Sequence, residues 1–171
     1  MAEDLAVGDA RVASQPETET GVALTQEAFQ PRDPDFAGRV RASFERQTLM
    51  VLLGAKLGRV EAGAVDIAVG YRADLTQQHG YLHAAVTTAI ADTACGYAAL
   101  TLTPANSEVL SVEFKVNLLR PAVGRLFVAE GRVLKLGRTL SVVRGDVFAT
   151  TEDDRSTLIA TMLATIIVQS R

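Results

Sequence analysis

The stretch that determines the architecture runs His83-Ala-Ala-Val-Thr-Thr-Ala-Ile-Ala-Asp92-Thr-Ala-Cys-Gly-Tyr-Ala-Ala-Leu100. Its many alanines favour a helix, and a helix without a charged face must be covered on nearly all sides. Asp92 carries the only formal charge between Asp74 and Glu108. A carboxylate in so apolar a segment is costly to bury unless it is paired, protonated or used. Asp92 is therefore a candidate catalytic group, the alternative being a position on a solvated face of the helix.

The segments on both sides of this stretch predict a second helix and an antiparallel sheet. Apolar residues recur at helical spacing from Phe36 and predict one helix that ends before Gly54. Short strands are expected at residues 56–60 and 64–70, around a turn at 61–63. Residues 110–118 alternate between apolar and polar with a period of two, and further strands are expected at 126–135, 139–150 and 157–168.

This order of elements predicts the fold class and the domain organisation. A curved antiparallel sheet wrapped around the central apolar helix is the simplest way to cover that helix, which gives an α+β domain. We expect a single domain over residues 34–171. Residues 1–33 lack sustained periodicity and are rich in polar residues, so we expect a mobile N-terminal tail there.

Composition excludes several classes of function. The net charge is −3 and the basic residues are scattered, so we expect neither nucleic acid nor a membrane surface as partner. The single cysteine, Cys95, cannot form an internal disulfide and is expected to be a small core residue. With only two histidines besides it, we expect no metal site. The sequence shows no signal peptide and no membrane-spanning segment, so we expect a cytoplasmic protein.

The segment from Gln77 to Asp92 resembles the signature of hotdog-fold acyl-CoA thioesterases of the PaaI and 4-hydroxybenzoyl-CoA types. In that family an Asn or Gln precedes a His-Gly-Gly by six residues, and an Asp or Glu follows the His by nine. Gln77, His83 and Asp92 keep this spacing. The strand that ends before Pro121 and the hairpin at residues 133–139 match the family as well.

The resemblance implies a hotdog fold, a curved antiparallel β-sheet around a long central α-helix. It implies hydrolysis of an acyl- or aroyl-CoA to the free acid and CoA, without a cofactor, in a homodimer or a homotetramer built as a dimer of dimers. The family uses the first backbone N–H after the His to polarise the thioester carbonyl, which places Ala84 in the site. The chain departs from the family by having Ala84-Ala85 in place of Gly-Gly. Alanine keeps the N–H donor, so the departure bears on substrate range.

The chemistry assigns candidate roles to the signature residues. Asp92 either deprotonates a water or attacks the carbonyl to form a mixed anhydride, and both routes are open. Gln77 can orient the water or the thioester, or can be an ordinary loop amide. His83 is either a catalytic residue or the N-terminal cap of the helix.

Helix geometry predicts that one active site is shared by two protomers. Ala84 and Asp92 are eight residues apart, about 12 Å along one helix. A short Asp side chain cannot bridge that gap. We therefore expect the helix N-terminus of one protomer to meet Asp92 of a partner, in a two-fold dimer with two shared sites.

Further residues are candidates for substrate binding. Ser111 lies on the polar face of its predicted strand and can reach the site across the dimer, or is a plain surface serine. The turn residues Gly137, Arg138 and Thr139, with Lys135, are first a β-turn and can also meet the CoA phosphates.

Two other functions stay open at this level. A hydratase or dehydratase on the same fold commonly uses an Asp-His pair a few residues apart, and the spacing of nine here disfavours it. A non-catalytic acyl-CoA-binding module is the third possibility. The acyl group itself is not specified by the sequence.

Overall fold

The computed structural model describes residues 29–170, so most of the predicted N-terminal tail lies outside the described residues. Within the part that is described, Phe29 packs against the hydrophobic core. Asp33 is buried and its carboxylate lies 3.1 Å from Nε of Arg39. The chain therefore contacts the domain from residue 29 onward.

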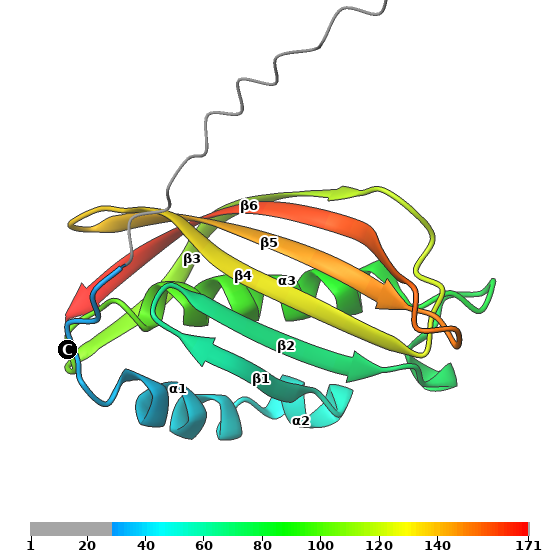
Figure 1. The fold of residues 1–171 in the computed structure, drawn as a ribbon, viewed down its shortest axis with the longest axis horizontal. Coiled ribbons are helices and arrows are strands. Elements are labelled where there is room, and N and C mark those ends of the chain that lie inside the picture. The colour runs from blue at the N-terminus through cyan, green and yellow to red at the C-terminus, as the bar shows by residue number, and fades with distance from the viewer. Residues whose placement is uncertain (1–28, 171) are drawn as a thin grey trace, which may run out of the picture.

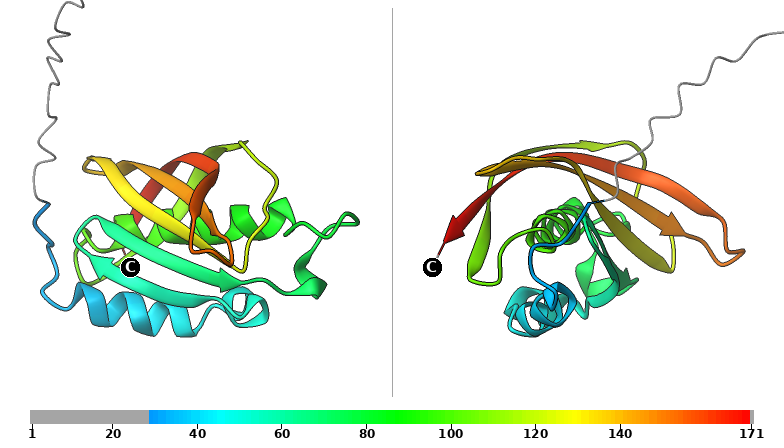
Figure 2. Two further views of the ribbon diagram at one scale, coloured as in Figure 1. Left: turned by 45° about the vertical axis from the view of Figure 1, so that its right-hand side comes forward. Right: turned by 60° about the vertical axis from the view of Figure 1, so that its left-hand side comes forward.

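A six-stranded antiparallel sheet and a central helix make up the domain (Figure 1). The elements in chain order are α1 (Phe36–Glu45), α2 (Thr48–Leu53), β1 (Lys56–Glu61), β2 (Ala64–Gly70), the short 3-10 helix η1 (Ala73–Leu75), α3 (Ala84–Leu100), β3 (Ser107–Leu118), β4 (Leu126–Leu136), β5 (Leu140–Thr150) and β6 (Ser156–Ser170). The strand order is β1-β2-β4-β5-β6-β3, with every neighbouring pair antiparallel. The sheet arches over α3, and α1 lies on the open side of the arch (Figure 2). The predicted α+β hotdog fold is confirmed.

Small residues let α3 lie close against the sheet. A Cβ atom added at Gly131 of β4 would lie 2.3 Å from the carbonyl oxygen of Ala94. One added at Gly145 of β5 would lie 2.8 Å from Sγ of Cys95. Ala94 and Cys95 are fully buried. The sheet therefore carries glycines where the backbone of α3 approaches it most closely, which fixes the helix in place.

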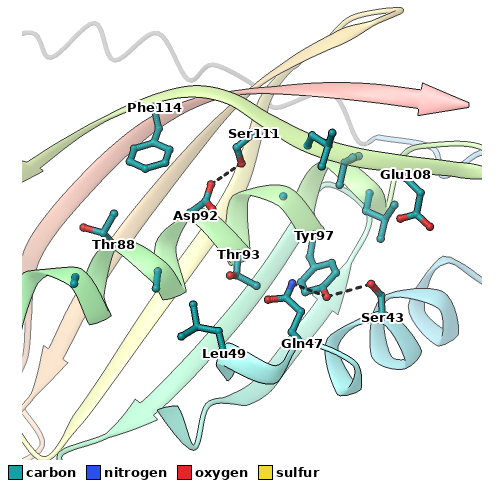
Figure 3. A pocket seen from close by; sticks show the side chains of 16 residues that line it. Ser43, Gln47, Leu49, Thr88, Asp92, Thr93, Tyr97, Glu108, Ser111 and Phe114 are labelled. Atoms are coloured by element: carbon teal, nitrogen blue, oxygen red, sulfur yellow. Dashed lines mark hydrogen bonds between the residues drawn. The ribbon is translucent and has the colours of Figure 1, made fainter. Parts of the chain in front are cut away.

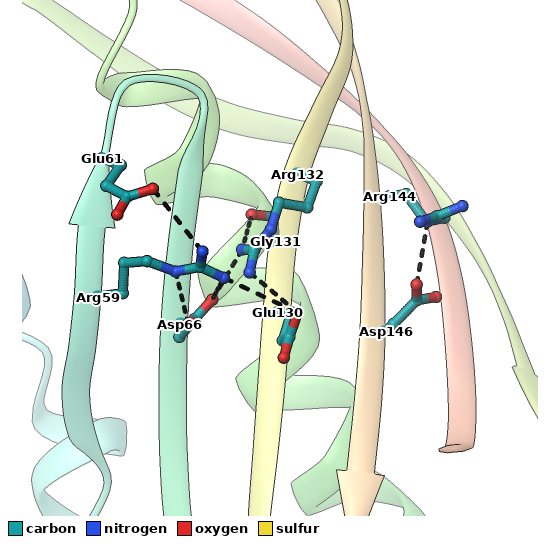
Figure 4. Close-up of polar contacts among 8 residues, drawn as sticks. All are labelled: Arg59, Glu61, Asp66, Glu130, Gly131, Arg132, Arg144 and Asp146. Carbon is teal, nitrogen blue, oxygen red and sulfur yellow. Dashed lines mark hydrogen bonds and ion pairs between the residues drawn. The ribbon is translucent and has the colours of Figure 1, made fainter. Parts of the chain in front are cut away.

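Paired charges cover the outer face of the sheet (Figure 4). The carboxylate of Asp66 lies 3.0 Å from Nε of Arg59 and 2.7 Å from a terminal guanidinium nitrogen of Arg132. Nε of Arg144 lies 3.0 Å from the carboxylate of Asp146. Partial burial raises the pKa of the Asp66 carboxyl, and the hydrogen bond from Arg59 opposes that rise. The residues before and after Asp66 in β2 point to the core and are fully buried. The sheet thus carries these charges on its outer face, together with exposed leucines such as Leu163, and is apolar toward α3.

The helical region before β1 differs from the prediction. The sequence predicts one helix from Phe36 to the residue before Gly54, whereas the structure has two helices separated at Gln47. The backbone of Gln47 is extended, with φ −79° and ψ 98°. Its side-chain amide donates to the hydroxyl of Tyr97 at 2.9 Å. The prediction of a single helix is therefore wrong. The break coincides with a contact to a distant part of the chain, which local periodicity does not reveal.

The alternation predicted for β3 is interrupted by a β-bulge. Ser111 pairs with Ile166 of β6 and Glu113 pairs with the preceding residue, Thr165, so Val112 is the additional residue on β3. Because of this insertion Ser111 and Phe114 come to the same side of the strand, and both line the cavity beside α3. The strict alternation predicted for residues 110–118 is therefore wrong at this point of the strand.

Among residues 29–170, none of the helices is both long and apolar enough to cross a membrane.

Candidate active site

Asp92 lies half-buried in the middle of α3 and accepts a hydrogen bond from β3 (Figure 3). The hydroxyl of Ser111 donates to Oδ1 of Asp92 at 2.6 Å. Both residues belong to the same protomer, so Ser111 reaches Asp92 without crossing a dimer interface. No residue of the described chain donates to Oδ2. The serine therefore orients the carboxylate through one oxygen and leaves the other to a substrate or a water.

A cavity of about 650 Å³, here called the Asp92 cavity, lies along one stripe of α3. The stripe repeats every three or four residues, as one helix face does, and consists of Ala85, Thr88, Ala89, Asp92, Thr93, Gly96, Tyr97 and Leu100. The opposite walls come from β3, including Phe114, and from α1 and α2, including Leu49. The charged lining residues are Asp92 and Glu108, both acidic. The cavity therefore suits a mainly apolar group without negative charge.

His83 caps the N-terminus of α3. Its Nδ1 accepts a hydrogen bond from the backbone N–H of Ala85 at 2.9 Å, so a neutral His83 carries its proton on Nε2. His83 lines neither the Asp92 cavity nor the cavity at the helix N-terminus. Of the two roles considered for it, the structure shows the cap.

Ala84 lies at the first position of α3 and lines a second cavity of about 380 Å³, here called the Ala84 cavity. Within residues 29–170 no acceptor receives its backbone N–H. The positive end of the helix dipole lies at the same place. A free N–H at a helix N-terminus is suited to a carbonyl oxygen that gains negative charge.

Gln77 also lines the Ala84 cavity. Its side-chain oxygen accepts a hydrogen bond from the backbone N–H of His79. No acceptor in the described part of the chain receives its Nε2. The amide is thus held by its oxygen and keeps a donor for a ligand.

One protomer does not bring all predicted residues together. Asp92 and Ser111 line one cavity, whereas Gln77 and Ala84 line the other. The eight residues from Ala84 to Asp92 correspond to about 12 Å of helix rise. Each protomer therefore holds two separated halves of the predicted constellation.

The hairpin between β4 and β5 lies apart from both cavities. Gly137, Arg138 and Thr139 line a hollow of about 280 Å³ that Arg32 lines as well. Lys135 is not among its lining residues. A Cβ atom at Gly137 would lie 2.3 Å from the carbonyl oxygen of Leu140, so the tight turn requires glycine. The hollow is therefore lined by two cationic side chains, Arg138, which was predicted, and Arg32, which was not.

Most residues that line the Asp92 cavity were not predicted as site residues. Among them are Ser43, Gln47, Tyr97 and Phe114. Tyr97 follows Thr93 by one turn on the same stripe, so the helical repeat alone contained a signal for it. Ser43 and Gln47 carry no such signal, because their approach to α3 depends on the break between α1 and α2.

Cys95 is fully buried and does not line the Asp92 cavity. Burial raises the pKa of its thiol to about 12, and the carboxylates of Asp92 and Asp146 add to the rise. A thiol of that kind is not a nucleophile at neutral pH. Within residues 29–170 no three His, Cys, Asp or Glu side chains are grouped so that they could hold a metal ion.

Comparison with known proteins identifies related chains. Residues 79–155 match the family model described as thioesterase superfamily. A thioesterase family protein from Silicibacter pomeroyi is 43% identical, covers 80% of this chain and 99% of its own, and superposes with a TM-score of 0.78. The Escherichia coli PaaI protein, from the phenylacetic acid degradation operon, is 16% identical and shares the fold with a TM-score of 0.68, over 77% of this chain and 91% of its own.

Two esterase candidates of Saccharolobus solfataricus are similar in sequence. SSO1253 is 30% identical over 75% of this chain and 83% of its own length. SSO2140 is 34% identical over 53% of this chain, and the match spans 64% of that protein.

Proposed function

We propose a reaction on one premise: the chain belongs to the thioesterase superfamily and is a thioester hydrolase of the hotdog fold. The substrate is an acyl- or aroyl-CoA, which reacts with water to give the free acid and CoA. The observation that carries the proposal is the pair of complementary half-sites. One holds a carboxylate oriented by Ser111, and the other holds the free N–H of Ala84.

Asp92 supplies the nucleophile. Oδ2 either takes a proton from a water that attacks the thioester carbonyl, or attacks that carbonyl itself and forms a mixed anhydride that water then hydrolyses. In both routes the carbon–sulfur bond breaks, and CoA leaves as a thiol once it is protonated. The hydrogen bond from Ser111 at 2.6 Å orients the carboxylate for either route.

The N-terminus of α3 stabilises the charge that develops on the carbonyl oxygen. The N–H of Ala84 donates to this oxygen, and the helix dipole adds to the effect. Nε2 of Gln77, in the same cavity, donates to the water or to the thioester. Because one protomer separates Ala84 from Asp92 by about 12 Å of helix rise, these donors act on a thioester held by Asp92 of a partner.

The edge of the sheet supports the dimer that this site requires. β3 is the last strand in the sheet order, spans 12 residues and pairs only with β6 among the described strands. Leu110 is 55% exposed, Val112 55% and Leu118 56%. A long apolar edge strand is a template for pairing with another chain. We infer a two-fold dimer in which β3 pairs with its counterpart, and the family resemblance extends this to a dimer of dimers.

The hollow beside the β4–β5 hairpin is proposed to meet the phosphates of CoA. Arg138 and Arg32 both line it, and guanidinium groups bind phosphate well. Gly137 and Thr139 line the same hollow.

A hydratase on the same fold is disfavoured by the position of His83. Water addition to an enoyl thioester by an Asp-His pair requires the imidazole beside the carboxylate. His83 instead uses Nδ1 to accept from the backbone N–H of Ala85, so its neutral imidazole has no free nitrogen to take a proton beside Asp92 of its own chain or of a partner.

The direct test of the reaction is Asp92→Asn, assayed by thiol release across a panel of acyl-CoAs. We expect kcat to fall by about 10²- to 10⁴-fold, because the amide can neither accept the proton nor attack. Asp153→Asn, in the exposed turn between β5 and β6, is the matched control and should hydrolyse at the wild-type rate. Circular dichroism checks that both variants fold. Undiminished hydrolysis by folded Asp92→Asn would refute the role of this carboxylate.

A further inference from the structure

Three polar side chains meet at the end of the Asp92 cavity that is remote from the start of α3 (Figure 3). Nε2 of Gln47 donates to the hydroxyl of Tyr97 at 2.9 Å, and this hydroxyl donates to Oγ of Ser43 at 3.2 Å. Tyr97 is only 4% exposed, and its ring packs against Phe44 with centroids 6.2 Å apart. The cluster is therefore held rigidly by α1, the break at Gln47 and α3.

Two hydrogen-bonding groups of this cluster are left over. Within residues 29–170, Oε1 of Gln47 accepts a hydrogen bond from no residue. The hydroxyl of Ser43 donates to none of these residues either. The amide oxygen points away from Tyr97 in Figure 3. The cluster thus offers a free acceptor on Gln47 and a free donor on Ser43, and a hydroxyl group can bind to either because it both donates and accepts. Polar groups in a mostly apolar cavity are stabilised when such a partner is bound.

The cavity leads from the reacting carboxylate to this cluster. Asp92 and Tyr97 are five residues apart on α3, about 7.5 Å of rise. Between them Gly96 lines the cavity, and a Cβ atom added there would meet nothing within 4 Å. Both charged lining residues are acidic, so they disfavour the anionic end of CoA. The space beyond Asp92 thus suits the acyl group.

We propose that Ser43, Gln47 and Tyr97 form a subsite that binds a hydroxyl group on the acyl chain of the substrate. The preferred thioesters are medium-chain acyl-CoAs with a hydroxyl on about the sixth carbon, the carbonyl carbon being the first, since an extended chain of that length spans the rise of about 7.5 Å between Asp92 and Tyr97. This assignment names a substrate class and rests on the proposed thioesterase function.

The test compares 6-hydroxyhexanoyl-CoA with hexanoyl-CoA as substrates of the full chain. We expect wild-type kcat/KM to be about tenfold higher for the hydroxylated thioester, because a hydrogen bond to Gln47 or Ser43 is gained. In the double variant Ser43→Ala/Gln47→Met this ratio should fall to about one. The side chain of Gln47 makes no capping hydrogen bond to α2, so the change leaves that helix end intact. Gln30→Met, at an exposed position, is the matched control and should keep the wild-type ratio.

Each outcome decides the matter. Equal kcat/KM for the two thioesters in the wild type, or a preference that survives in the double variant, would overturn the subsite. If the subsite fails in this way but hexanoyl-CoA is still hydrolysed in an Asp92-dependent manner, the proposed thioesterase function stands. If neither thioester nor any other acyl-CoA releases thiol, the proposed function fails and the subsite with it.

Discussion

At the residue scale, the partner of Asp92 is a hydroxyl and not a cation. Ser111 donates to one carboxylate oxygen, and in the described chain no Lys, Arg or His side chain pairs with Asp92. A strong ion pair would stabilise the carboxylate and reduce its reactivity, whereas one neutral donor orients it. The environment of Asp92 is therefore consistent with a carboxylate that is used in catalysis.

The thiol of Cys95 offers a prediction at the same scale. Because burial, with nearby carboxylates, raises its pKa to about 12, the thiol stays protonated well above neutral pH. We expect Ellman's reagent at about pH 8 to leave the native protein unlabelled and to label one thiol per chain after unfolding in guanidinium. Rapid stoichiometric labelling of the native protein would contradict this. The expected result also means that a thiol assay reports released CoA alone.

At the element scale, one glycine within α3 and one glycine of the sheet that α3 contacts have opposite roles. Gly96 lies within α3 and borders the Asp92 cavity, where an added Cβ meets open space. Gly131 lies in β4, where an added Cβ would lie 2.3 Å from the carbonyl oxygen of Ala94. The first glycine keeps space for a ligand, and the second lets the helix approach the sheet.

The two alanine substitutions should therefore change stability in opposite directions. Gly96→Ala should raise the free energy of unfolding by about 0.5–1 kcal/mol, because alanine restricts the unfolded chain and favours a helix. Gly131→Ala should lower it by about 1–3 kcal/mol, because the backbones must move apart. Urea unfolding at one protein concentration measures both. A change of the same sign in the two variants would contradict the assignment.

Local patterns predicted the elements but not the two irregularities that shape the cavity. The helical and alternating periodicities located α3 and all six strands, because each depends on residues close together in sequence. The break at Gln47 coincides with a hydrogen bond to Tyr97, 50 residues away. The bulge at Val112 appears only in the register with β6. Tertiary contacts determine both, so the contribution of Ser43 and Gln47 to the site could not be predicted.

At the scale of the whole molecule, the candidate residues of the proposed site lie in two separate groups. Asp92 with Ser111 lies near the middle of α3, and Ala84 with Gln77 lies at its start. The resemblance to the thioesterase signature implied Gln77 and Ala84, and the spacing on one helix predicted the separation of Ala84 from Asp92. A two-fold axis beside β3 would bring each half-site to the complementary one and would cover the exposed apolar edge. The proposed dimer would therefore serve the chemistry as well as the sheet.

Removal of a single backbone N–H makes the proposed arrangement testable. Ala84→Pro deletes the donor at the first helical position, where proline is well tolerated. The preceding residue, His83, has ψ 138°, which suits a residue before proline. The substitution should lower kcat by about 10²- to 10³-fold without unfolding the protein, as loss of one carbonyl-stabilising donor does. Ala84→Ser, which keeps the N–H, is the control.

The most direct measurement is the activity of heterodimers that combine one Asp92→Asn protomer with one Ala84→Pro protomer, purified through two different tags. In a shared arrangement one of the two sites receives Asp92 from one chain and the Ala84 N–H from the other, so both groups are intact there. We predict recovery of about half the wild-type activity, although each parent homodimer is nearly inactive. Heterodimers as inactive as both parents would contradict a site built from two protomers.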